Sequence, residues 1–267
     1  MCELFAMSSL FSTNVSFSLE RLARRGGAEG PHRDGWGVAF YTGRDALLLR
    51  EAGAASESEL VRHVERHGPP SECVISHIRL ATLGARTLAN TQPFGRELGG
   101  CTHVFAHNGD LEDVRARVPA AGKRFAPVGE TDSEWAFCRL LDCLAALWDQ
   151  RTEEAPPLAE RFAAIASYAA TLRELGPANF IYSDSHTLFV HADHRVDMGS
   201  GARLPGIYLL ERSCDEAVPD LAASGVILQT ARQALTLVAS VPLTDEPWDA
   251  IADGELLAIE NGAVVSV

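Results

Sequence analysis

The chain begins Met1-Cys2-Glu3-Leu4-Phe5, and the cysteine in second position is the residue from which the fold is inferred. Removal of the initiator methionine leaves a thiol and a free α-amine on one residue. An α-amine has an unperturbed pKa of about 7.7 to 8.0, so near neutral pH part of it is unprotonated and can accept the thiol proton, directly or through one water. Cys2 therefore needs no histidine partner to act as a nucleophile. Taken alone, a second-position cysteine is more often incidental, so its meaning depends on the residues that accompany it.

Four further segments combine small residues with polar side chains and lie beside expected strands, where functional sites tend to be built. In the last segment, Asn108 supplies a side-chain amide and Gly109 a backbone N–H that no Cβ obstructs, and this pair suits an oxyanion hole. Asn-Gly is also a strong signal for a tight turn, which is the structural alternative. The segments are HRDGWG (residues 32–37), HIRLAT (77–82), NTQPF (90–94) and HNGD (107–110).

Two charged residues could bind the charged head group of an amino acid. Arg79 ends an apolar strand, and a guanidinium there can form a bidentate pair with a carboxylate, although an arginine emerging from a strand into solvent is the more ordinary arrangement. Asp132 lies in the first turn of an expected helix, where the helix dipole favours a carboxylate in any protein. In the functional interpretation, Asp132 binds a substrate ammonium group.

In this order, and behind Cys2, the segments resemble the class II glutamine amidotransferases, most closely the stand-alone bacterial YafJ-like members. The resemblance covers nearly the whole chain. Each motif is common by itself, whereas the complete succession is highly specific. The additional matching segments are MCELF (residues 1–5), GP (30–31), AHNG (106–109), VGETDSE (128–134), PLT (242–244) and Trp248.

The resemblance implies an N-terminal-nucleophile hydrolase fold, which is an α+β, four-layer αββα sandwich of two antiparallel sheets between helix layers. It implies a single glutamine amidotransferase type 2 domain over residues 2–267, with Met1 removed on maturation. The implied activity is hydrolysis of glutamine or another γ-glutamyl amide through a Cys2 thioester, with release of ammonia or an amine. By similarity the Asn108 side chain and the Gly109 amide bind the oxyanion, and no cofactor is expected.

The remaining site residues also follow from the resemblance. Arg79, helped by Thr82, is expected to hold the α-carboxylate of the substrate, and Asp132 its α-ammonium group. Arg25 matches the arginine that steadies the N-terminal residue in the family, although extra residues separate it here from the next motif.

The apolar pattern predicts strands first, then helices, then strands again. That order lacks the strict alternation that builds a parallel doubly wound sheet, so it favours antiparallel sheets covered by helices. The first helix opens with Ser56 and Glu59, which form a capping-box pattern, and the second opens with Thr131 and Glu134 in the same pattern. The predicted strands span residues 36–41, 46–49, 73–78, 102–106, 179–182, 187–191, 206–210, 235–240 and 254–260, and the predicted helices span residues 56–67, 131–148 and, after a proline pair, a stretch to about residue 175.

Composition limits the partners and the location. The chain has 23 Lys and Arg against 36 Asp and Glu, a formal net charge of −13 that disfavours nucleic acid and anionic lipid. Residues 1–17 contain Glu3 but no Lys or Arg, and no apolar run has the length of a bilayer span, so we expect a cytoplasmic protein without a membrane partner. The six cysteines include no Cys-x-x-Cys pair, and most of them apart from Cys2 are expected to be small buried hydrophobes.

The sequence leaves two alternatives open. A metal-dependent hydrolase could use His103 and His107, expected in a strand-like run, or His186, His191 and His194, expected in a hydrophilic turn. A catalytically silent regulatory protein could keep the fold without the activity. The fate of the ammonia is open as well: a separate ammonia-accepting synthase subunit could receive it, or the small-molecule substrate could be a larger γ-glutamyl amide.

Overall fold

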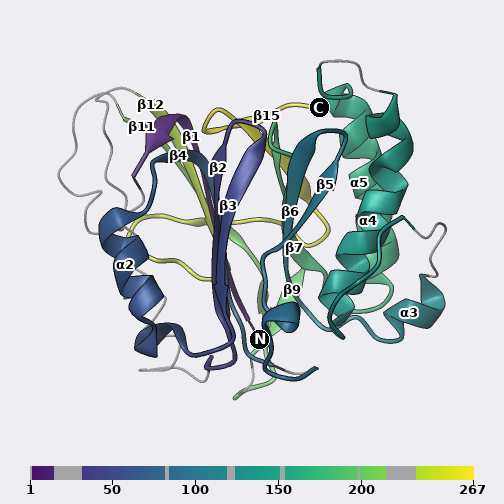
Figure 1. The fold of residues 1–267 in the computed structure, drawn as a ribbon, viewed down its shortest axis with the longest axis horizontal. Helices are drawn as coiled ribbons and strands as arrows, with labels where there is room; N and C mark the ends of the chain where they lie inside the picture. Colours follow the sequence, from purple (N-terminus) through teal and green to yellow (C-terminus); the bar gives the residue numbers. More distant parts are fainter. Residues whose placement is uncertain are drawn as a thin grey trace.

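Two antiparallel β-sheets stacked face to face form the centre of the protein (Figure 1). The computed structural model describes residues 2–14, 32–81, 84–118, 124–150, 154–197, 199–214 and 233–267. The first sheet has seven strands in the order β13-β11-β12-β1-β4-β2-β3, so the strand nearest the N-terminus lies at its centre. Its strands are β1 (Glu3–Thr13), β2 (Trp36–Thr42), β3 (Asp45–Glu51), β4 (Ser71–Ile78), β11 (Tyr208–Cys214), β12 (Gln233–Ala239) and β13 (Asp249–Ala250).

The second sheet has six strands in the order β15-β14-β8-β7-β6-β5, and every neighbouring pair is antiparallel. A separate two-stranded ribbon pairs β9 with β10. These strands are β5 (Phe94–Leu98), β6 (Cys101–Asn108), β7 (Asn179–Ser183), β8 (Leu188–His191), β9 (His194–Val196), β10 (Arg203–Pro205), β14 (Leu256–Glu260) and β15 (Ala263–Val265).

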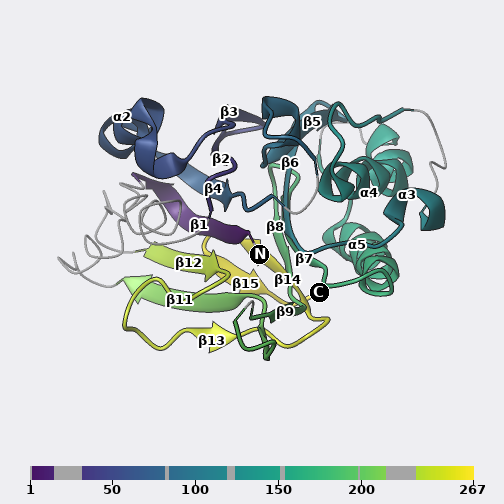
Figure 2. The same cartoon turned by 90° about the horizontal axis from the view of Figure 1, so that it is seen from below.

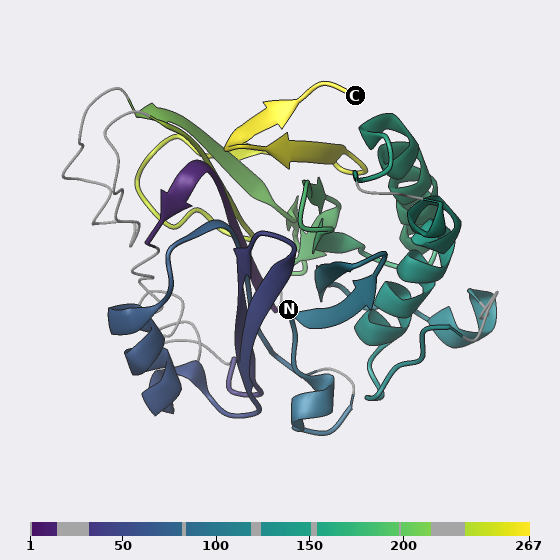
Figure 3. The ribbon, with the colours of Figure 1, turned by 45° about the horizontal axis from the view of Figure 1, so that its top comes forward.

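Helices cover the outer faces of the two sheets (Figures 2 and 3). Helix α2 (Glu59–His67) lies outside the first sheet, and α4 (Asp132–Asp149) packs beside α5 (Leu158–Arg173) outside the second. The layer order is helix, sheet, sheet, helix, so the αββα sandwich expected from the sequence is confirmed. None of the helices in the described ranges is long and apolar enough to cross a membrane. The short helical turns are η2 (Ala55–Glu57), η3 (Leu88–Asn90) and α3 (Val114–Arg117).

Apolar side chains fill the three spaces between these four layers. Successive strand residues point to opposite faces, so each central strand supplies two layers of the core. On β1, Leu4 and Ala6 point inward and pack with Val104 and Ala106 of β6, whereas Phe5 faces the α2 side. The two sheets are therefore held face to face by small and branched side chains, and residues at the strand ends can meet across the same layer.

Most predicted strand and helix ranges are confirmed by the structure, but the sequence analysis missed β1. This strand is buried on both faces along most of its length. A doubly buried strand shows no alternation of polar and apolar residues, and that alternation is the pattern by which most strands are recognised. Strand β5 was missed as well, because the motif that includes Phe94 suggested a loop.

The predicted cap residue was correct for α4 and wrong for α2, and the Glu134 carboxylate accepts the N–H groups of Val128 and Gly129 instead of closing the capping box. Thr131 precedes α4, and its Oγ1 accepts the N–H of Glu134 at 3.2 Å, as expected. The cap of α2 is Ser58, whose Oγ accepts the N–H of Val61 at 3.0 Å, and not Ser56. Residues 55–57 form a 3-10 turn before the helix, so the α-helix begins later than the pattern suggested.

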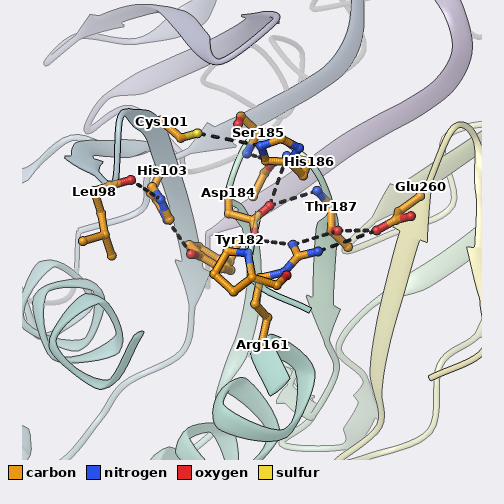
Figure 4. Close-up of polar contacts among 12 residues, drawn as sticks. Leu98, Cys101, His103, Arg161, Tyr182, Asp184, Ser185, His186, Thr187 and Glu260 are labelled. Atoms are coloured by element: carbon orange, nitrogen blue, oxygen red, sulfur yellow. Dashed lines mark hydrogen bonds and ion pairs between the residues drawn. The ribbon is translucent and has the colours of Figure 1, made fainter. Parts of the chain in front are cut away.

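A buried ion pair fixes α5 against the turn between β7 and β8 (Figure 4). The Arg161 Nη1 atom lies 2.5 Å from Asp184 Oδ2 and 3.0 Å from Thr187 Oγ1, and the Nε atom donates to the Pro156 carbonyl at 2.8 Å. Asp184 also accepts the N–H of Thr187 at 2.9 Å. Because Arg161 and Asp184 are both buried, neither charge can be rehydrated if its partner is removed.

We therefore expect Arg161→Met to lower the free energy of unfolding by about 3 to 5 kcal/mol, since it leaves the Asp184 carboxylate buried without its cation. Urea unfolding followed by circular dichroism measures this change. The matched control is Arg203→Met, because Arg203 pairs with Asp253 at the surface, and it should cost less than about 1 kcal/mol. Equal losses of unfolding free energy in the two variants would show that the buried Arg161 pair contributes no more to stability than the exposed Arg203 pair.

Candidate active site

Cys2 and Arg79 are brought together at one end of the first sheet. Strands β1 and β4 are antiparallel with Glu3 opposite Ile78, so the next position in this register places Cys2 opposite Arg79. The following residue, Leu80, contacts the sulfur through its backbone: its N–H donates to Cys2 Sγ at 3.3 Å, and the thiol donates to its carbonyl oxygen at 3.4 Å. The beginning of β1 thus lies against the loop that follows β4.

The surroundings of Cys2 favour the protonated thiol. Burial raises the pKa of the Cys2 thiol to about 11, while the Leu80 hydrogen bond and the Arg79 charge act to lower it. The Asp132 carboxylate acts in the other direction and contributes to the raised pKa. A thiol with such a pKa is protonated at neutral pH, so it needs a base to become a nucleophile. The charges of Arg79 and Asp132 thus act on the pKa of the same thiol in opposite directions.

The Arg79 guanidinium is buried under the loop that follows it. Its Nη1 atom donates to the backbone carbonyls of Asp34 at 3.4 Å and Ala85 at 3.0 Å, and its Nη2 atom to that of Gly84 at 3.1 Å. Gly84 has a φ of +77°, and a Cβ there would lie 2.9 Å from Asn90 Nδ2, so only glycine fits this turn. The loop therefore closes over Arg79 through backbone atoms.

Asn108 and Gly109 reach the same end of the sandwich from the second sheet. Asn108 is the last residue of β6, and two positions earlier Ala106 packs in the inner layer with Leu4 of β1. Side chains alternate along a strand, so Asn108 points to the same inner face of its sheet as Ala106. By the same rule, Cys2 points to the same inner face of the other sheet as Leu4. The two candidate catalytic groups thus come from facing sheets.

The side chain of Asn108 is buried, and neither its Nδ2 nor its Oδ1 atom has a hydrogen-bond partner in the described part of the chain. A Cβ at Gly109 would lie 1.7 Å from the Pro177 carbonyl oxygen and 2.8 Å from His107 Nε2, so no larger residue fits there. The Gln92 side chain holds His107, the residue before Asn108, because it accepts the His107 N–H at 2.6 Å and donates to the His107 carbonyl at 3.1 Å. The Asn108 side-chain amide thus has no hydrogen-bond partner among the described residues, while the backbone beside it is held in place.

Asp132 is the first residue of α4 and binds the loop that follows Gly109. Its Oδ2 atom accepts the N–H of Leu111 at 2.9 Å, and its Oδ1 atom accepts the N–H of Ser133 at 2.8 Å. These bonds tie the start of α4 to the end of β6. The position of the carboxylate at a helix N-terminus also agrees with the ordinary effect of the helix dipole.

Two buried side chains connect the loops around these residues. Asn90 accepts the N–H of Glu130 at 2.7 Å and donates to the Ala85 carbonyl at 3.0 Å, so it joins the loop over the guanidinium to the loop before α4. Glu134 accepts the N–H of Gly129 at 2.6 Å and fixes that second loop from within the helix. Asn90 lies in a motif that the sequence analysis singled out without giving it a role, whereas Glu134 was expected only in the capping box of α4.

His77 is a buried histidine near the site. It lies two positions before Arg79, is fully buried, and has no hydrogen-bond partner on either ring nitrogen among the described residues. Burial, together with smaller effects of the neighbouring His107 and Arg79, lowers the pKa of His77 to about 3. The folded protein therefore keeps this ring neutral well below neutral pH, whereas the unfolded chain protonates it with a pKa of about 6.5.

This difference makes the stability depend on pH. Between about pH 6.5 and pH 3 the unfolded chain binds a proton that folded His77 does not, so the contribution of His77 falls as the pH falls. Lowering the pH from 7 to 5 should cost about 2 kcal/mol through this residue. We expect His77→Leu to reduce the pH-dependent loss by about that amount, measured by urea unfolding at both pH values. The exposed His63→Leu is the control, and an unchanged slope in His77→Leu would contradict the assignment.

His103 and His107, considered above as metal ligands, lie on β6 as expected but bind other groups. The His103 Nδ1 atom lies 2.5 Å from Tyr182 Oη, and its Nε2 atom lies 3.0 Å from the Leu98 carbonyl oxygen (Figure 4). The His107 Nδ1 atom lies 2.9 Å from Ser133 Oγ and helps to hold the start of α4. Both rings therefore serve packing between β6 and its neighbours.

The expectation that the three later histidines share a hydrophilic turn was wrong for His191 and for His194, which is the first residue of β9. His186 lies exposed in the turn after β7, whereas His191 is buried at the end of β8, and its Nδ1 atom lies 2.6 Å from the Ala178 carbonyl oxygen. The strand predicted over residues 187–191 already included His191, and the structure has that strand and not the turn.

One group of side chains in the described ranges has the spacing of metal ligands. It consists of Asp193, His194 and Asp253. Its two carboxylates already pair with arginines, Asp193 with Arg173 and Asp253 with Arg203. Positive guanidinium groups at both carboxylates oppose the binding of a cation, so this group is better explained as an ion-pair network.

Two predicted site residues, Arg25 and Thr82, lie outside the described residues. The structure adds two others that the sequence analysis did not assign, Leu80 and Asp34. Leu80 acts through its backbone, which leaves no signal in its side chain. Asp34 lies in the HRDGWG motif that the sequence analysis singled out, but its burial, which is unusual for an aspartate, is visible only in the structure.

Comparison with known proteins shows the family to which the chain belongs. A family model described as "Glutamine amidotransferases class-II" matches residues 1–267. The chain belongs to the class II glutamine amidotransferases. Its relative YafJ from Escherichia coli is 35% identical over 262 residues, which cover 96% of each protein. A solved structure from Pseudomonas aeruginosa, described as a predicted glutamine amidotransferase, is 32% identical over the full length of both chains, with a TM-score of 0.70.

More distant structures share the fold. The allosteric regulatory enzyme of purine biosynthesis is 18% identical, and its alignment covers 98% of this chain and 48% of that one, with a TM-score of 0.59. At 18% identity, this similarity shows a shared fold, the sandwich of two sheets between helices. The family itself indicates an activity on the glutamine amide.

Proposed function

We propose that this protein hydrolyses the side-chain amide of glutamine, or of another γ-glutamyl amide, through a thioester on Cys2. One observation supports the proposal beyond the family: the Cys2 sulfur lies against the Leu80 peptide, Arg79 is opposite Cys2 in the register of β1 and β4, and the charges of Arg79 and Asp132 both act on the thiol pKa. A cation and an anion that both act on one thiol suit a substrate that carries an α-carboxylate and an α-ammonium group and must present its amide to the sulfur.

The first half of the proposed reaction forms the thioester. With Met1 removed, the α-amine of Cys2 takes the thiol proton, which is required because burial raises the thiol pKa. The thiolate attacks the amide carbon, and the oxyanion accepts hydrogen bonds from Asn108 Nδ2 and the Gly109 N–H. The carbon–nitrogen bond then breaks, and the leaving nitrogen takes the proton from the α-ammonium group and departs as ammonia or an amine.

The second half releases the acid. The free α-amine accepts a proton from water, the resulting hydroxide attacks the thioester carbon, and the same oxyanion hole holds the negative charge. The carbon–sulfur bond breaks, the thiolate recovers its proton, and glutamate leaves. In this proposal Arg79 and Thr82 bind the α-carboxylate, Asp132 binds the α-ammonium group, and Arg25 steadies the N-terminal residue.

The test is an activity screen of protein whose Cys2 N-terminus is established by intact mass. We expect ammonia or amine release from glutamine or from one of a panel of γ-glutamyl amides, and formation of γ-glutamyl hydroxamate when hydroxylamine is added, because hydroxylamine captures a thioester. Labelling of Cys2 by a glutamine-mimicking diazoketone provides a second readout. Absence of turnover, hydroxamate and label in correctly processed protein would favour the catalytically silent alternative.

The same screen addresses the fate of the nitrogen. A higher kcat/KM for one γ-glutamyl amide than for glutamine would favour hydrolysis of a larger metabolite. A preference for glutamine itself would favour delivery of ammonia to a separate synthase subunit, since family members that aminate a second substrate need an acceptor site.

A further inference from the structure

The Gln92 side chain extends the pairing between β5 and β6. The two strands pair as far as Phe94 opposite Phe105, and Pro93, the residue before β5, has no N–H with which to continue the ladder. Two positions further along this register, residue 92 faces His107. There the Gln92 amide accepts the His107 N–H at 2.6 Å and donates to the His107 carbonyl at 3.1 Å. The side chain thus supplies the acceptor and the donor that the peptide groups of a neighbouring strand would supply.

Gln92 reaches His107 from a backbone that the first sheet holds. Gln92 is 5% exposed, and its main-chain carbonyl lies against Gly37 of β2, where it leaves no room for a Cβ. The carbonyl of the preceding residue, Thr91, accepts a hydrogen bond from Arg50 Nη1 of β3 at 2.8 Å. Because the side chain starts from a fixed backbone, its two hydrogen bonds restrain His107 and do not simply follow its movements.

The two hydrogen bonds act on both peptide groups that flank His107. The N–H belongs to the peptide between Ala106 and His107, and the carbonyl belongs to the peptide between His107 and Asn108, whose plane contains the Cα atom of Asn108. The Asn108 side chain branches from that Cα, and its buried amide has no hydrogen-bond partner among the described residues. The position of the amide therefore depends on the backbone that carries it. The Gly109 N–H belongs to the next peptide, which these bonds do not touch.

We propose that Gln92 is a positioning residue of the oxyanion hole, which holds the backbone on both sides of His107 and so keeps the Asn108 amide within reach of the oxyanion. The inference rests on the proposed function, in which Asn108 Nδ2 donates to the oxyanion. Such a donor acts in the transition state, and a displacement of about 1 Å in a catalytic group can cost about a hundredfold in rate. Loss of the Gln92 hydrogen bonds should therefore lower kcat and leave KM nearly unchanged.

The chain offers a matched control for Gln92 in a second buried glutamine. Gln233 is also 5% exposed, and it binds the far end of β1: its Oε1 atom accepts the Phe11 N–H at 3.1 Å, and its Nε2 atom donates to Thr13 Oγ1 at 3.1 Å. Replacement by methionine keeps the length of either side chain and removes two buried hydrogen bonds. Gln92→Met and Gln233→Met should therefore lower the free energy of unfolding to a similar extent.

The experiment measures kcat and KM for the preferred amide, per folded molecule, in both methionine variants. We expect Gln92→Met to lower kcat by about ten- to a hundredfold with KM within about threefold of the parent, and Gln233→Met to change neither by more than about threefold. In an Asn108→Ala background, Gln92→Met should lower kcat by no more than about threefold, because the group that it positions is already gone. Should Gln92→Met fail to fold, Gln92→Asn makes the same test, since an amide one methylene shorter cannot keep both bonds.

A further measurement needs no substrate. Amide hydrogen exchange at residues 107 and 108, followed by NMR in the folded protein, should be at least about tenfold faster in Gln92→Met than in the parent, because this end of β6 loses its restraint. Unchanged exchange would overturn the restraint itself.

Three kinetic outcomes would also overturn the inference. If Gln233→Met lowers kcat as much as Gln92→Met, a general loss of stability is responsible. If Gln92→Met keeps the kcat of the parent, its hydrogen bonds do not position a catalytic group. If its full effect persists in the Asn108→Ala background, Gln92 acts on another group. A parent without turnover on any amide would instead overturn the proposed function, and the catalytic part of this inference with it, whatever the exchange measurement shows.

Discussion

Replacement of Cys2 by serine is expected to lower the turnover of glutamine or the preferred γ-glutamyl amide by at least about a thousandfold. The substitution keeps the shape of the residue and its α-amine, but a hydroxyl is much harder to deprotonate than a thiol. The burial that raises the thiol pKa disfavours an alkoxide even more strongly. Ammonia release under saturating substrate measures the change, and intact mass establishes the N-terminal residue of each preparation.

The matched control for this substitution is Cys143→Ser. Cys143 is an exposed cysteine on α4, so its replacement should leave both turnover and unfolding unchanged. Turnover of Cys2→Ser within a few-fold of the parent would remove Cys2 from the mechanism. Loss of hydroxamate formation in the same variant would connect the effect to the thioester rather than to substrate binding.

Residue patterns could predict antiparallel sheets covered by helices, whereas the four-layer sandwich was predicted from the family resemblance. Alternating or uniformly apolar runs identify most strands, and a capping threonine identifies the start of α4. The failures have physical causes. Strand β1 is buried on both faces, so it lacks the alternation of a half-exposed strand. His191 was assigned both to a predicted strand and to a hydrophilic turn, because the apolar run ends at this residue and polar residues follow.

The candidate site was predictable to the extent that side chains carry its chemistry. Cys2, Arg79 and Asp132 were singled out by residue type and motif, and in the structure the two charged groups influence the pKa of the one thiol. The contact that bears most directly on the sulfur comes from the Leu80 backbone, and any residue could supply it. Such a contact depends on the register of β1 and β4, which no local pattern of residues reveals.

Asn108→Ala is the second variant for which we expect a large effect, and it separates catalysis from stability. The buried Asn108 amide has no hydrogen-bond partner in the described part of the protein, so its removal breaks no such bond there. Its cost in unfolding free energy should therefore be below about 1 kcal/mol, because no partner is left unsatisfied. Turnover should fall about a hundred- to a thousandfold with little change in KM, since an oxyanion donor acts in the transition state.

The contrasting variant is Asn179→Ala, on the strand next to Asn108. The Asn179 side chain donates to the carbonyls of Asn108 at 3.2 Å and His194 at 3.0 Å, and it accepts the N–H of Asp193 at 2.7 Å. Its loss should cost about 2 to 4 kcal/mol of unfolding free energy, because buried groups lose their partners. The two variants should thus show different losses. Asn179→Ala should lower the free energy of unfolding measured with urea, and Asn108→Ala should lower turnover. If Asn108→Ala instead loses stability and keeps its turnover per folded molecule, the amide supports the fold and does not bind the oxyanion.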